Sequence, residues 1–175
     1  MSPRNLRPLA IFRCDGGVSI GNGHVMRCLV LAEALSASGW TCCFASNPEA
    51  PVDIPALARS GYGTIGVVVE DGTKALQEHW PEGCELLVVD HYWLDQGFEA
   101  ALRPWAKQIL VIDDLANRAH DADYLVDQTL LRRAEDYASL VPRHCMFYLG
   151  GSHALLRAQF RAARGVALQH RARSN

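Results

Sequence analysis

A glycine-rich loop that ends in a histidine is the part of the sequence best suited to chemistry. The residues from Cys14 to His24 read CDGGVSIGNGH, follow an apolar run and lead into the strongest helical pattern of the chain. At such a junction of strand and helix, backbone N–H groups and the helix dipole can receive a phosphate. The spacing matches neither the G-x-G-x-x-G dinucleotide motif nor the P-loop. The loop therefore predicts either a phosphate site or a turn whose glycines supply positive φ angles.

His24 stands at the start of that helix, where the positive end of the helix dipole disfavours an imidazolium ion. A neutral imidazole can accept a proton. Beside a bound pyrophosphate, such a histidine would act as general base on a water molecule. The alternative is a structural histidine that hydrogen-bonds the loop, and the residues by themselves favour this alternative slightly.

Polar residues also follow two other apolar runs, at the strand edge where function concentrates. Asp90 is placed to orient a neighbouring side chain, Tyr92 to donate a hydrogen bond to a reacting oxygen, and Asp95 to cap the next helix. The adjacent Asp113 and Asp114 point apart at a strand end, which disfavours a shared metal ion. The seven histidines show no metal-ligand spacing. We therefore expect no metal and no cofactor.

The elements that must position these residues are short apolar runs separated by helical segments. Continuous apolar strands indicate a parallel sheet covered on both faces, and hence an α/β fold. The clearest helix begins near His24, and Gly39 follows it as a stop signal. Weaker helical stretches are punctuated by Pro55, Pro81 and Pro104. The expected strands are Leu9–Arg13, Thr41–Ala45, Thr64–Val69, Glu85–Val89, Gln108–Ile112, Tyr124–Val126 and Met146–Leu149.

The chain length fits one domain. Its 175 residues predict a single Rossmann-like domain over residues 1–164. A further helix is expected over Ala154–Ala167. Residues 165–175 lose apolar periodicity and are expected to form a tail or the start of a linker.

Composition and charge exclude several classes of protein. A net charge of -2, from 17 Lys+Arg and 19 Asp+Glu, gives no broad basic field for nucleic acid. The six cysteines form no C-x-x-C pair, which favours reduced thiols. The first apolar run is too short for a signal peptide or a membrane span, so we expect a cytoplasmic protein.

Several ordered motifs together resemble the UDP-2,4-diacetamido-2,4,6-trideoxy-β-L-altropyranose hydrolases of pseudaminic acid biosynthesis. The first two carry the loop, as Arg13-Cys14-Asp15 and Ile20-Gly21-Asn22-Gly23-His24 with the Val-Met-Arg-Cys-Leu that follows. Others lie further along the chain: Val89-Asp90-His91-Tyr92, Val111-Ile112-Asp113-Asp114-Leu115-Ala116-Asn117-Arg118, Asp127-Gln128 and Tyr148-Leu149-Gly150. The resemblance covers nearly all of residues 8–161, and it favours the functional interpretation of both the loop and His24.

This resemblance implies the N-terminal half of a GT-B fold, in which two Rossmann-like halves enclose a sugar nucleotide. It implies that water attacks the anomeric carbon and UDP leaves, with no metal. His24 would be the general base and Tyr92 an assisting residue. The candidate substrate-binding residues are Arg13, Asp15, Gly21, Gly23, Arg27, Asp90 and Asp113. Nothing after Gly165 provides a second sheet, so a separate C-terminal domain or a homo-oligomer is the expected partner.

Two other functions stay open at this point. One is the acceptor domain of a GT-B glycosyltransferase, which would transfer the sugar to an acceptor rather than to water. The other is a non-catalytic module that binds a sugar nucleotide or docks a partner without turnover. Release of UDP from UDP-sugars, measured with and without an acceptor, separates the three.

Overall fold

The computed structural model describes residues 7–157, 160, 163 and 171. In this part of the chain, seven parallel strands form one sheet in the order β3-β2-β1-β4-β5-β6-β7. The predicted Rossmann-like α/β fold is therefore confirmed. The strands are β1 (Leu9–Cys14), β2 (Thr41–Ser46), β3 (Gly63–Gly66), β4 (Cys84–Asp90), β5 (Ala106–Ile112), β6 (Tyr124–Asp127) and β7 (Met146–Leu149).

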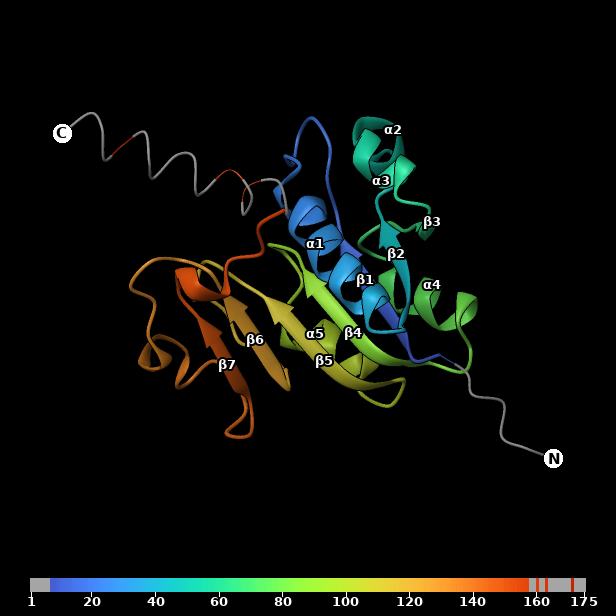
Figure 1. The fold of residues 1–175 in the computed structure, drawn as a ribbon. Helices are drawn as coiled ribbons and strands as arrows, with labels where there is room; N and C mark the ends of the chain where they lie inside the picture. The colour runs from blue at the N-terminus through green and yellow to red at the C-terminus, as the bar shows by residue number, and fades with distance from the viewer. Residues whose placement is uncertain (1–6, 158–159, 161–162, 164–170, 172–175) are drawn as a thin grey trace.

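Helices cover both faces of the sheet, as Figure 1 shows. One face carries α1 (Gly23–Ala37), α2 (Ala50–Asp53) and α3 (Pro55–Arg59), whose apolar side chains pack on one core cluster. The other face carries α4 (Gly72–His79) and α5 (Gln96–Leu102). No described helix is long and apolar enough to cross a membrane.

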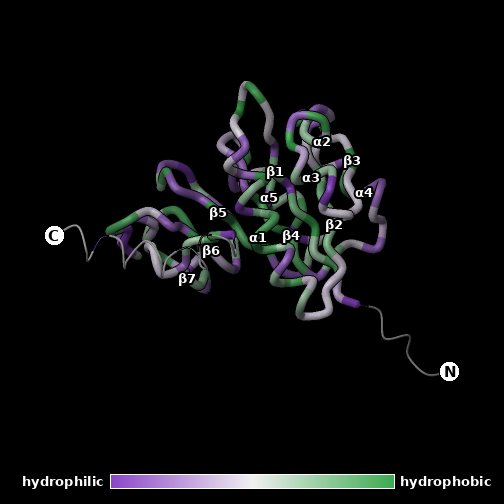
Figure 2. The backbone as a smooth tube through the Cα atoms, turned by 45° about the horizontal axis from the view of Figure 1, so that its top comes forward, coloured by the Kyte–Doolittle hydropathy of each residue, from purple (hydrophilic) through white to green (hydrophobic). Residues whose placement is uncertain are grey.

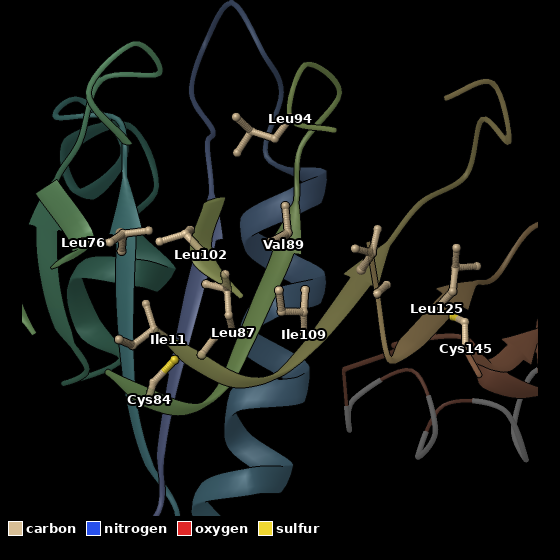
Figure 3. Close-up of a cluster of buried hydrophobic side chains, with 14 of the residues drawn as sticks. Ile11, Leu76, Cys84, Leu87, Val89, Leu94, Leu102, Ile109, Leu125 and Cys145 are labelled. Atoms are coloured by element: carbon tan, nitrogen blue, oxygen red, sulfur yellow. The ribbon is translucent and has the colours of Figure 1, made fainter. Parts of the chain in front are cut away.

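The core forms because alternate residues of each strand point to opposite faces of the sheet. In Figure 3, Ile11 of β1 and Leu87 of β4 lie on the face where Leu102 of α5 packs. Their neighbours Phe12 and Val88 face α1 instead. Since both faces are buried, the central strands are apolar throughout, and Figure 2 shows hydrophobic segments concentrated there.

Two expected elements differ from the structure by more than two residues. The third strand was expected over Thr64–Val69, but it ends at Gly66, where its neighbour in the described sheet, β2, ends opposite it at Ser46. The expected helix over Ala154–Ala167 is wrong for residues 154–157, which are not helical. Most of its remaining residues, the expected tail at 165–175 and residues 1–6 lie outside the described part.

The strand order reverses between β1 and β4. From β1 the chain moves outward through β2 to β3, and then it returns to β4 on the other side of β1. Such a switch point leaves a crevice at the carboxyl ends of the two strands, where ligands of open α/β sheets bind. The glycine-rich loop follows β1, and the segment with Tyr92 follows β4, so both lie at this point.

Candidate active site

His24 is held at the switch point by a buried carboxylate. It is the second residue of α1, and its Nδ1 lies 2.5 Å from Oδ1 of Asp90, the last residue of β4. Asp90 is fully buried, and nearby positive groups hold its pKa below the usual range although burial opposes this. An ionised Asp90 makes Nδ1 the protonated nitrogen. The acceptor lone pair of a neutral His24 is then on Nε2.

Tyr92 lies against this histidine. The two ring centroids are 4.5 Å apart and the rings meet edge to face. Tyr92 is about 39% exposed, whereas His24 is 5% exposed. Tyr92 therefore covers His24 and also faces solvent, so the structure brings together the two side chains expected to act on one substrate.

Arg27 lies one helical turn after His24 and joins two strand ends. Its guanidinium donates to both oxygens of Asp90, at 2.5 and 2.6 Å, and to Oδ2 of Asp114 at 2.9 Å. These carboxylates raise the pKa of Arg27, which stays charged. The bridge ties α1 to the ends of β4 and β5. Asp114, which follows β5, was not expected to belong to the site.

A second histidine–carboxylate pair crosses the first. His91 follows β4, and its Nε2 lies 2.9 Å from Oδ2 of Asp15, which follows β1. Its Nδ1 accepts the backbone N–H of Trp93. Arg13 donates two hydrogen bonds to Asp15. Burial would raise the pKa of Asp15, but His91 and Arg13 lower it to about 2. Both nitrogens of His91 are therefore occupied, unlike those of His24.

Asp113 is held in a network of its own. It is buried, and it accepts from Arg118, from the Tyr137 hydroxyl and from the backbone N–H of Ala116. These donors hold its pKa below the usual range, although burial opposes this. Since Asp114 bonds to Arg27 instead, the two adjacent carboxylates have separate partners. Within the described residues, no three His, Cys, Asp or Glu side chains gather as metal ligands.

The glycine-rich loop forms a tight hairpin rather than an open phosphate-binding loop. Gly17 and Gly21 exchange two backbone hydrogen bonds, and the N–H groups of Gly16 and Val18 donate to Asn47 and Asp53. Figure 1 shows the loop between β1 and α1 standing out from the body of the molecule. These amides are already bonded, so a phosphate would have to meet other donors.

The first turn of α1 offers such donors. The first helical bond runs from Met26 to Asn22, and the Asn22 side chain makes no cap, so the preceding amides have no helical partner. A cavity of about 430 Å³ lies beside this turn and is lined in part by Gly23, Arg27, Gln128 and Arg157. Gly21 and Gly23 are exposed here.

The other candidate substrate-binding residues are buried. Arg13, Asp15, Asp90 and Asp113 are at most 3% exposed, and Arg27 is 9% exposed. All five bind one another or other protein groups, as described above. His24 is buried too, but among the described residues only its Nδ1 makes a hydrogen bond. We therefore expect direct contact with a ligand from Nε2 of His24, from Tyr92 and from the start of α1.

Fold and site together define a Rossmann-like α/β protein with a carboxylate-held histidine at the switch point of its sheet. The chain is similar to the UDP-2,4-diacetamido-2,4,6-trideoxy-beta-L-altropyranose hydrolase of Campylobacter jejuni, with 32% identity over 155 residues. The match covers 86% of this chain and 52% of that protein, so the chain spans about half the length of the relative. The resemblance inferred from the motifs is thereby confirmed. No protein-family model matches the chain.

Proposed function

We propose that this chain carries the catalytic-base half of a sugar-nucleotide hydrolase that releases UDP from UDP-2,4-diacetamido-2,4,6-trideoxy-β-L-altrose. The observation that carries the proposal is the pair formed by His24 and the buried Asp90 beside Tyr92. Similarity to a protein named as such a hydrolase supports the choice of substrate. We also propose that the reaction belongs to pseudaminic acid biosynthesis and takes place in the cytoplasm, as the sequence motifs imply.

In the proposed reaction, Nε2 of His24 takes a proton from water while the water oxygen bonds to the anomeric carbon. The bond from that carbon to the diphosphate oxygen breaks, and UDP leaves with the electron pair. Asp90 keeps Nδ1 protonated and the ring oriented, as the carboxylate of a catalytic triad does. Tyr92, which contacts the ring and faces solvent, is placed to hydrogen-bond the attacking water or the sugar.

The diphosphate needs more than this half provides. Arg13 and Arg27 already neutralise buried carboxylates, which leaves the first amides of α1 and the exposed Arg157 of the neighbouring cavity as phosphate donors. Exposed apolar residues follow the carboxyl ends of β1, β4, β5 and β6 around the site: Val18, Tyr92, Trp93, Leu115, Leu130 and Leu131. An exposed apolar rim of this kind suits an opposing protein surface. We propose a second domain, as in a GT-B fold, or a partner chain over this rim.

The experiment is an assay of UDP release from UDP-sugars by the 175-residue chain, with and without an acceptor and with a homologous second domain added in trans. We expect little or no turnover alone, because positioning a UDP-sugar requires contacts to uracil, ribose and both phosphates. Addition of the second domain should raise turnover without an acceptor.

Three results would contradict this proposal. Turnover that requires a sugar acceptor would favour a glycosyltransferase domain, and UDP binding without turnover in any combination would favour a binding module. Robust turnover by the chain alone, unaffected by the added domain, would show that one half contains a complete site.

A further inference from the structure

The guanidinium of Arg27 sits between the carboxylate that holds His24 and a second carboxylate. It bonds both oxygens of Asp90, and its Nη2 lies 3.3 Å from Nδ1 of His24. Its remaining bonded nitrogen, Nη1, donates to Asp114. All three guanidinium nitrogens of Arg27 thus bond to carboxylates, and only 9% of the residue is exposed. Arg27 is therefore poorly placed to bind a substrate.

We propose that Arg27 is a positioning residue that sets the protonation of His24 through Asp90, and that Asp114 balances the charge of Arg27. This inference rests on the proposed role of His24 as a base. A carboxylate 2.5 Å from an imidazole, left unopposed, would favour the imidazolium, which cannot take a proton from water. The positive charge of Arg27 on the same carboxylate opposes this and keeps a neutral base available.

The charges around His24 support this division of roles. From β4 it meets Asp90, and from α1 it meets Arg27 and the positive end of the helix dipole. The Tyr92 ring meets the His24 ring at 80°. The Cys28 thiol also contacts Asp90, but burial raises its pKa well above the usual value, so it adds no charge. Arg27 and Asp114 are thus the charges whose removal should move the titration of His24 in opposite directions.

The test is an NMR titration of the His24 ring in the 175-residue chain and three variants. In Arg27→Gln, Asp90 loses its positive partner, and we expect the His24 titration midpoint to rise by about 1 pH unit or more. In Asp114→Asn, Arg27 loses a competing negative charge, and the midpoint should fall. Arg27→Lys keeps the charge without the fork, so its midpoint should lie between those of the parent and Arg27→Gln.

The opposite signs distinguish this role from a structural one, in which all three variants would lower stability without moving the midpoint in two directions. If Arg27→Gln does not fold, Asp114→Asn and Arg27→Lys still decide: a midpoint that is unchanged or raised in Asp114→Asn overturns the inference. In a hydrolysing assembly, the acidic limb of kcat/KM should follow the NMR midpoints. If the NMR midpoints shift as expected but the acidic limb of kcat/KM does not follow them, His24 is not the base. The role of Arg27 in setting the protonation of His24 would still hold.

Discussion

Two histidines at one edge of the sheet differ in what their second nitrogen does. His91 uses one nitrogen on Asp15 and the other on the backbone of Trp93. His24 uses Nδ1 on Asp90, and its ring is covered by the partly exposed Tyr92. A base needs a nitrogen that is free to take a proton, so the hydrogen bonds favour His24 over His91 as the proposed base, a choice that residue type alone could not make.

Replacing His24 and His91 separately tests this distinction. In an assembly that hydrolyses the UDP-sugar, His24→Ala should lower turnover by about 10²–10⁴-fold, the usual contribution of general-base catalysis. Its stability to urea should stay near that of the parent, because Arg27 still pairs with Asp90. His91→Ala leaves a buried oxygen of Asp15 with one donor fewer, and it should lose about 1–3 kcal/mol of stability.

UDP release and urea unfolding of both variants give the answer. Unaltered turnover in His24→Ala would remove this histidine from the mechanism. A loss of stability as large as that of His91→Ala, with turnover per folded molecule preserved, would make His24 a structural residue.

At the scale of elements, the turn before β4 fixes the position at which this strand begins, and Asp90 is its last residue. Gly83 has a φ of +78°, and a Cβ at this position would lie 2.1 Å from the carbonyl oxygen of Trp105. The N–H of Cys84 bonds to the same carbonyl and starts the pairing of β4 with β5. The turn thus requires glycine for both its backbone angle and its close approach.

Gly83→Ala should therefore destabilise the protein more than Gly39→Ala. Gly39 also has a positive φ, of +88°, but no atom lies within 4 Å of an added Cβ. Gly39→Ala should cost about 1–2 kcal/mol from backbone strain alone. Gly83→Ala adds overpacking against a backbone atom, typically about 1–3 kcal/mol more. Equal losses in urea unfolding would show that the turn moves to make room.

Much of this architecture follows from the sequence because buried parallel strands are apolar throughout. All seven strands were expected, and the cap of α5 by Asp95 is confirmed by its bond to the N–H of Gly97. The pairing of charges was not predicted: Arg27 and Asp114 are 87 positions apart, and His91 and Asp15 are 76 apart. Such partners depend on which strands become neighbours, and spacing along the chain does not contain that information.

At the scale of the molecule, three buried carboxylates at the carboxyl edge of the sheet are kept ionised. Positive or hydrogen-bonding partners hold the pKa of Asp15 at about 2 and lower those of Asp90 and Asp113. In an unfolded chain, each of these carboxylates would have its ordinary pKa near 3.8. Folding therefore favours the ionised forms, and protonation must weaken the fold.

Because these folded-state pKa values are depressed, their stabilisation is fully present above about pH 4 and is lost as the pH falls toward 2. We expect the midpoint of urea unfolding to drop steeply over this range. Asp15→Asn should be less stable at pH 7 and show a shallower drop. The exposed Asp71→Asn serves as control and should follow the parent. A parent-like slope in Asp15→Asn would mean that Asp15 does not contribute to the acid dependence.

The crossed pairs at the switch point also bear on how the chain finds its strand alignment. Cys14 lies opposite Asp90, and in this alignment His24 reaches Asp90 while His91 reaches Asp15. A slip of one residue displaces the strand ends by about 3.3 Å and would separate each of these buried carboxylates from its histidine, although Arg13 would still pair with Asp15. Hydrophobic side chains tolerate approximate packing, but buried charges do not. The crossed pairs would therefore penalise misaligned sheets during folding, so weakening either pair should yield more misfolded chains, and weakening the pair of His24 and Asp90 should also slow the proposed reaction.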